Sequence, residues 1–112
     1  MESILTSIKK LLGIAEDYEY FDTDIIMHIN SAFMVLNQIG VGSSKPFFIE
    51  DKTKTWSDFL AFDMEAVKTY IYFKVKLAFD PPTSSAAIES INKQINELEW
   101  RLNVAAESKV GE

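Results

Sequence analysis

Hydrophobic residues recur at helical spacing along most of the chain, and short breaking segments separate these runs. The first run predicts a helix over residues 3–12, which ends at Gly13 because glycine readily adopts the left-handed conformation that closes a helix. A second helix is predicted from Asp22 or Thr23, either of which can cap it, to about Ile39. Its core positions are Ile25, Ile29, Phe33 and Leu36.

Three further helical segments are predicted in the second half of the chain. Thr55 can cap a short helix that runs through Phe62, and a longer helix extends over residues 63–79. Pro81-Pro82 stops that helix, and the hydroxyl residues 83–85 begin the last one. The last helix has a narrow apolar stripe with spacings of three and four: Ile88, Ile91, Ile95, Leu98, Leu102 and Ala105. Such a stripe requires a partner surface, and the fold class predicted is all-α, a small bundle of four to five helices.

Between residues 40 and 55 the helical periodicity disappears. The pattern predicts a long loop, or a short strand or hairpin arm, around the apolar triplet Phe47-Phe48-Ile49. Three consecutive large apolar residues argue against disorder. Because loops often carry binding residues, we expect Phe47, Phe48 and Ile49 to be candidate interface residues.

Several apolar residues exceed what a small core requires. Met27 and Met34 lie one heptad apart and off the main stripe of their helix, which indicates a second contact face. The helix over 63–79 is apolar on most sides, so we expect it to be central, with one flank covered by another copy of the protein. Trp56, Trp100 and Arg101 are further interface candidates, although the pattern leaves a core position open for both tryptophans.

Length and composition are those of a single domain over residues 1–112. With 47% hydrophobic residues the chain can bury one core, formed by the short helix 3–12 and a bundle over 22–106, while the order of 107–112 stays open. No apolar run approaches the roughly 20 residues that span a bilayer, and no signal peptide is recognisable, so we expect synthesis in a cytoplasm. A net charge of −6 makes sequence-specific binding of nucleic acid unfavourable.

Candidate chemistry is sparse. The chain has no cysteine, and His28, its one histidine, lacks the companions of a metal ligand or general base, with Asp24 one turn earlier. The acidic run over 16–24 lacks the glycine and the terminal glutamate of an EF-hand and is interpreted as a solvated linker. No phosphate-binding, zinc-hydrolase or serine-hydrolase motif occurs. We therefore expect no enzyme activity, no catalytic residue, no cofactor and no metal.

The order and spacing of short segments over nearly the whole chain resemble a known family. These segments are Lys9-Lys10-Leu11-Leu12-Gly13-Ile14, Ile39-Gly40-Val41-Gly42, Thr55-Trp56-Ser57-Asp58-Phe59, Tyr70-Ile71 with Lys74-Val75-Lys76-Leu77, Phe79-Asp80-Pro81-Pro82 and Glu99-Trp100-Arg101-Leu102. In this arrangement the chain resembles the head-to-tail connector proteins (adaptor or head-completion proteins) of long-tailed bacteriophages.

The resemblance implies a helical bundle that assembles as a roughly twelve-fold ring in the neck of the virion. The ring would bind the portal protein of the capsid on one side and a stopper or tail-completion protein on the other. DNA would pass through it without sequence-specific binding, and acidic residues lining the channel would favour that passage. Contacts would be sought in the loop 40–55 and both terminal segments.

Two other functions stay open from sequence. The chain could be a helical interaction module of a regulatory or scaffold system that binds one partner through the Ile88–Leu102 stripe and forms no ring. The chain could also be a small enzyme that uses His28 with Asp24.

Overall fold

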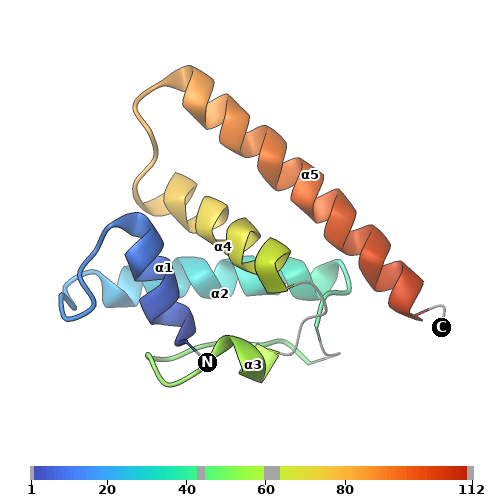
Figure 1. Ribbon diagram of the computed structural model, residues 1–112, viewed down its shortest axis with the longest axis horizontal. Helices are drawn as coiled ribbons and strands as arrows, with labels where there is room; N and C mark the ends of the chain where they lie inside the picture. The colour runs from blue at the N-terminus through green and yellow to red at the C-terminus, as the bar shows by residue number, and fades with distance from the viewer. Residues whose placement is uncertain (1, 43–44, 60–63, 111–112) are drawn as a thin grey trace.

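The computed structural model describes residues 2–42, 45–59 and 64–110, and these form five helices (Figure 1). The helices are α1 (Ile4–Leu12), α2 (Asp22–Gln38), α3 (Trp56–Phe59), α4 (Met64–Phe79) and α5 (Ser85–Val110). The predicted all-α class is confirmed. Within the described residues the loop between α2 and α3 contains no strand, and the isolated antiparallel bridge between Ser3 and Thr55 is its nearest approach to a sheet. The loop prediction therefore holds, and a hairpin arm is not found.

Helix α4 is the centre of the bundle, as its apolar pattern predicts. It packs against α1, α2 and α5, and it buries Val67, Tyr70, Ile71 and Val75. Figure 1 shows α2 as the layer behind α1 and α4, with α5 lying along the other side of α4. The molecule is flat, with extents of 43 × 35 × 19 Å, and Figure 1 views it along the shortest of these.

The ends of α1 follow the sequence signals. The Ser3 hydroxyl accepts a hydrogen bond from the Thr6 N–H at 3.3 Å, which caps the start of the helix. Gly13 closes the helix in the left-handed conformation, with φ +82°, as predicted. Although α1 is short, Ile4, Leu5 and Ile8 are buried, so it contributes directly to the core.

The start of α2 differs from the prediction. Its N-cap position is Phe21, which makes no side-chain capping bond, so the expected cap by Asp22 or Thr23 is wrong. Asp22 lies inside the first turn, where its carboxylate meets Lys9 Nζ at 2.8 Å. Asp22 therefore forms a tertiary ion pair and does not cap its own helix. A negative charge in the first turn is still favourable, because it interacts with the helix dipole.

The segment around α3 is held by local polar contacts. Asp58 Oδ2 accepts the Thr55 N–H at 2.7 Å, which is the reciprocal bond of a capping box with aspartate in place of glutamate. This bond lowers the pKa of Asp58. The predicted extension of the helix to Phe62 lies outside the described residues, as does the start at Asp63 predicted for the next helix.

Helix α5 buries only part of its apolar stripe. Ser84 caps it by accepting the Ala87 N–H at 3.3 Å. Of its buried residues, Ile95 lies near the middle of the helix, and Leu102 and Ala106 lie in its second half. Asn103 Nδ2 donates to the Ile39 carbonyl at 3.0 Å and ties this half to the end of α2. The subunit therefore buries the stripe only at Ile95 and Leu102, and the other stripe residues are half-buried: Ile88, Ile91, Leu98 and Ala105.

Candidate interaction surfaces

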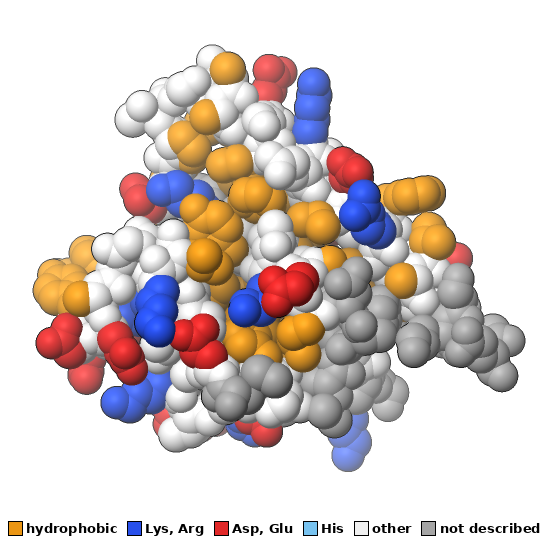
Figure 2. All heavy atoms as spheres, viewed as in Figure 1, with side chains coloured by type: hydrophobic (Ala, Val, Ile, Leu, Met, Phe, Trp, Pro, Cys, Tyr) orange, Lys and Arg blue, Asp and Glu red, His pale blue; other side chains and the backbone are white. Residues whose placement is uncertain are grey.

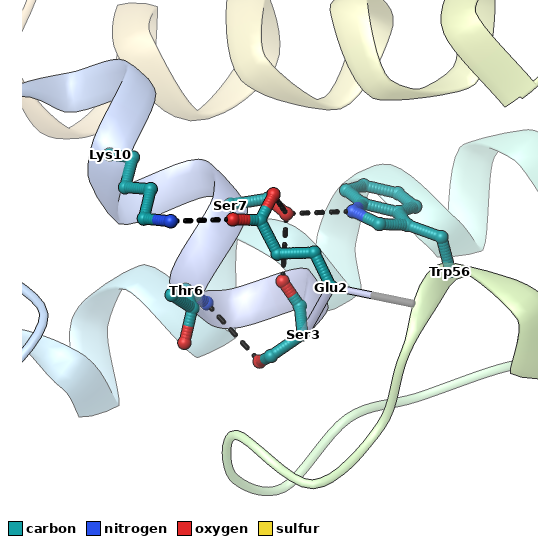
Figure 3. A network of polar contacts seen from close by, with 6 residues as sticks. All are labelled: Glu2, Ser3, Thr6, Ser7, Lys10 and Trp56. Carbon is teal, nitrogen blue, oxygen red and sulfur yellow. Dashed lines mark hydrogen bonds and ion pairs between the residues drawn. The ribbon is translucent and has the colours of Figure 1, made fainter.

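A polar network attaches the α3 region to α1 and places Trp56 in the core (Figure 3). The Trp56 indole Nε1 donates to Ser7 Oγ at 2.9 Å, and Ser7 Oγ also lies 2.7 Å from Glu2 Oε1. The main chain adds a bond from Ile4 N to the Lys54 carbonyl at 3.0 Å. Trp56 is 1% exposed. Of the two positions that the sequence left open for Trp56, the structure shows the core one, where the Ser7 hydroxyl satisfies the indole N–H.

Glu2 extends this network to the surface. Its carboxylate accepts a hydrogen bond from Lys10 Nζ at 2.7 Å, and Figure 3 shows Lys10 and Ser7 approaching it from the same helix. The bonds from Lys10 and Ser7 lower the pKa of Glu2. The first residues of the described chain are thereby fixed against α1.

The apolar triplet of the loop divides between core and surface. Ile49 is buried, and its main chain pairs with the Asn30 carboxamide through two hydrogen bonds of 2.9 and 2.8 Å. The Phe47 ring lies edge-on to Phe33, with centroids 4.9 Å apart. Phe48 is half exposed. Ile49 is therefore not available to a partner, Phe47 is half-buried, and Phe48 remains the interface candidate of the three.

The outer face of α2 is exposed and carries no charge beyond the first turn of the helix. Met27 and Met34 are 60% and 51% exposed, on the side of the helix opposite Ile25, Ile29 and Leu36. From residue 25 to residue 44 the sequence contains no Asp, Glu, Lys or Arg. Asp24, three residues before Met27, is the nearest charge in the helix, and exposed methionines on such a weakly charged face are typical of the centre of an interface.

A second exposed apolar group lies on the outer side of α5. Trp100 is 68% exposed, and Val104, one turn later, is 40% exposed. Arg101 is exposed and pairs with Glu97 at 3.1 Å on the same helix. Trp100 is thus a surface residue, whereas Trp56 is a core residue. The sequence had left both positions open for each tryptophan.

A groove of about 410 Å³ lies between α2, α4 and α5. His28 and Ser31 line it from α2, and Asn92, Asn96 and Glu99 line it from α5. At its edge the Tyr70 hydroxyl donates to Glu99 Oε2 at 2.7 Å. Burial, together with this bond, raises the pKa of Tyr70. The groove is lined mainly by polar side chains from α2, α4 and α5, and His28 and Ser31 lie about one turn apart on α2.

The acidic linker between α1 and α2 is organised by a buried lysine that sequence reasoning missed. Lys9 is 2% exposed, and its Nζ donates to the Glu16 carbonyl at 3.0 Å and the Tyr18 carbonyl at 2.7 Å, besides its ion pair with Asp22. The signal available in the sequence was weak, because a lysine beside Lys10 at the end of a helix is ordinarily exposed. Residues 15–20 of the linker are exposed, as predicted, while two of its main-chain carbonyls accept hydrogen bonds from the buried lysine.

Aromatic rings complete the linker. The Tyr20 and Phe21 rings meet edge to face with centroids 4.9 Å apart, and Phe21 packs in the same way on Phe79 of α4 at 5.2 Å. Tyr18 and Tyr20 remain 50% and 79% exposed. The linker therefore presents two tyrosines among carboxylates from a fixed backbone.

Over the described ranges, no three His, Cys, Asp or Glu side chains are grouped so as to hold a metal ion. No described helix is long and apolar enough to cross a membrane. What the described surface offers is a set of separate apolar patches on α2, α5, the linker and the 45–55 loop.

These features define a small all-α protein with exposed apolar residues on several of its elements. The family model for phage connector proteins matches residues 4–109, and the chain belongs to this family. Connector proteins are structural components of the virion. No curated protein and no solved structure shows significant similarity to the chain.

Proposed function

We propose that the chain forms a ring in the neck of the virion, between the portal of the capsid and the stopper or tail-completion protein, and extends the channel through which DNA passes. Membership of the connector family supports the location. The observation that carries the ring is the presence of apolar residues at the surface on different sides of one subunit, the exposed Met27 and Met34 on α2 and the half-buried Phe73, Ile91 and Leu98 between α4 and α5. A ring of identical subunits needs two different faces on each copy.

The exposed aromatic residues suit contacts with the neighbouring layers of the neck. We assign Phe48 on the loop, and Trp100 with Arg101 on α5, to the portal and the stopper or tail-completion protein, without ordering the two ends. Trp and Arg are enriched among residues that dominate binding energy. Each subunit contact can be weak alone, because a ring of identical sites engages the portal multivalently.

Charge supports the passage of DNA. A net charge of −6 provides no phosphate-binding energy, and lysines such as Lys9, Lys10 and Lys76 are already paired with carboxylates. We propose that carboxylates face the channel. A ring in which unpaired lysines line the lumen would contradict this part of the proposal.

The test is negative-stain imaging and sedimentation of the purified chain, alone and mixed with portal-containing connectors of the matching phage. Rings, or an added layer beneath the portal, are the expected result. A monomer that ignores the portal would contradict the proposal and favour an interaction module that binds one partner. The structure gives that module little support through the α5 stripe, because Ile95 and Leu102 are already buried within the subunit.

A further inference from the structure

Two uncharged surfaces lie on the two broad sides of this flat subunit. The first is the outer face of α2, which we call the methionine face and define by Met27 and Met34. In Figure 1 α2 lies behind α1 and α4, and the two methionines are on the side of α2 opposite its buried residues, so this face points away from the viewer. The thickness of the molecule in this direction is 19 Å, its smallest extent.

The second surface is the seam between α4 and α5, which we define by the half-buried Phe73, Ile91 and Leu98. Figure 2 shows hydrophobic side chains gathered along the boundary of these helices on the side that faces the viewer. Helical spacing agrees with this placement. Phe73 lies between Tyr70, which bonds to α5, and Leu77, so it is on the side of α4 that faces α5.

The two surfaces are compatible because neither brings an unpaired charge into the contact. The methionine face belongs to a stretch of sequence without Asp, Glu, Lys or Arg. Beside the seam, Lys76 is paired with Asp80 at 3.1 Å and Arg101 with Glu97 at 3.1 Å, so the nearby charges already have partners within the subunit. Two uncharged surfaces can meet without burying an unpaired charge. If either surface packed instead against the acidic linker or the 45–55 loop, it would remove water from the charged side chains there.

We infer that the methionine face of one copy packs against the α4–α5 seam of the next copy, broad side to broad side. This inference rests on the proposed ring and adds which faces meet in it. The two faces are different and lie on opposite sides, so the contact is heterologous and repeats around a closed ring, leaving the edges with Phe48 and the linker tyrosines for other partners.

The chain contains no cysteine, so introduced cysteines are the only thiols that a crosslinker can modify. Met34→Cys marks the methionine face. Gln94→Cys marks the seam, because the exposed Gln94 lies three residues after Ile91 and four before Leu98 on the surface of α5. The double variant is treated with a short flexible bismaleimide, and the products are resolved by denaturing electrophoresis.

We expect the double variant to give a ladder of dimers, trimers and larger species. Each single variant alone should stay monomeric, and an equal mixture of the two should stop at the dimer, because each molecule then has one reactive face. The matched control is Met34→Cys with Glu19→Cys on the exposed linker, which should give no ladder. Adding Met27→Glu to the crosslinking pair should reduce the ladder about tenfold, because it buries an unpaired charge.

Self-crosslinking of the Met34→Cys variant would overturn the inference by showing a two-fold contact between methionine faces. A double variant that gives no more ladder than its linker control would overturn it as well. Imaging of the unmodified chain on portal particles separates this from the proposed function. Rings without a ladder refute only the assignment of faces, and the lack of any ring or added layer refutes the proposed function itself.

Discussion

The carboxamide of Asn30 pairs with the main chain of Ile49 through two hydrogen bonds, from Nδ2 to the Ile49 carbonyl at 2.9 Å and from the Ile49 N–H to Oδ1 at 2.8 Å. A helix side chain thereby supplies the donor and acceptor that a neighbouring strand would give. This pairing explains how a segment without regular structure can bury Ile49 in the core.

Asn30→Asp should therefore destabilise the subunit. The new carboxylate retains the acceptor but loses the donor, and it places a negative charge beside the Ile49 carbonyl. We expect a loss of about 1–3 kcal/mol in the free energy of unfolding, measured by urea titration followed by circular dichroism. Asn96→Asp, at an exposed position on α5, is the control and should change stability little. Equal effects of the two variants would contradict the role given to this pairing.

The two tryptophans should respond oppositely to truncation. Trp56→Ala removes a buried ring and the partner of Ser7, and we expect a loss of about 3–5 kcal/mol in unfolding free energy. Trp100→Ala removes a ring that is 68% exposed and should change subunit stability by less than about 0.5 kcal/mol. Equilibrium denaturation of each variant measures this difference, and equal losses in the two variants would contradict the different placement of the two rings.

Lys9→Met should cost far more stability than Lys10→Met. Truncating Lys9 leaves two linker carbonyls and Asp22 without their shared donor, and breaking a buried ion pair costs about 3–5 kcal/mol. Lys10 is 58% exposed and pairs with Glu2 at the surface. Chemical denaturation of both variants provides the comparison. A Lys9→Met protein as stable as Lys10→Met would show that the linker is held by other contacts.

Tyr70 should make the subunit less stable at high pH. Its pKa is raised in the folded state, so above the ordinary tyrosine value of about 10 the unfolded chain loses this proton while the folded chain keeps it. The unfolded state is then favoured, and the free energy of unfolding falls as pH rises through this range. Below pH 10, Tyr70→Phe should cost about 1 kcal/mol through the lost bond to Glu99.

The pH dependence of that variant separates the two effects. Because a phenylalanine side chain does not titrate, the stability difference between the parent and Tyr70→Phe should shrink above pH 10, by at most about 1.4 kcal/mol per pH unit. Denaturant titrations between pH 8 and 11 measure this difference. Tyr20→Phe, at a 79% exposed position, serves as the control. A difference that stays constant over this range would contradict a raised pKa of Tyr70.

The helices and the central place of α4 could be predicted because they depend on local periodicity and on breakers such as Gly13 and the proline pair. The exposure of Met27 and Met34 followed from the same periodicity. Burial of Trp56 and Ile49 could not be predicted in this way. It depends on Ser7 and Asn30, which lie 49 and 19 residues away in sequence, and no helical period relates a loop residue to such a partner.

Lys9 escaped prediction for a related reason. Its partners are main-chain carbonyls of a linker, and main-chain groups leave no trace in the amino-acid pattern. The capping rule for α2 failed at the same place, since Asp22 satisfies Lys9 and not the helix end. Local sequence rules were therefore least informative around Lys9, a charged side chain that contacts both the linker and α2.

The carbonyl contacts of Lys9 have an evolutionary consequence. Because the lysine holds the linker at the Glu16 and Tyr18 main chain, the side chains at these positions are not needed for the shape of the loop. Substitutions at positions 16 and 18 should therefore leave the backbone of the linker in place as long as Lys9 and Asp22 are retained. The exposed side chains of this linker can therefore change in evolution without being limited by folding.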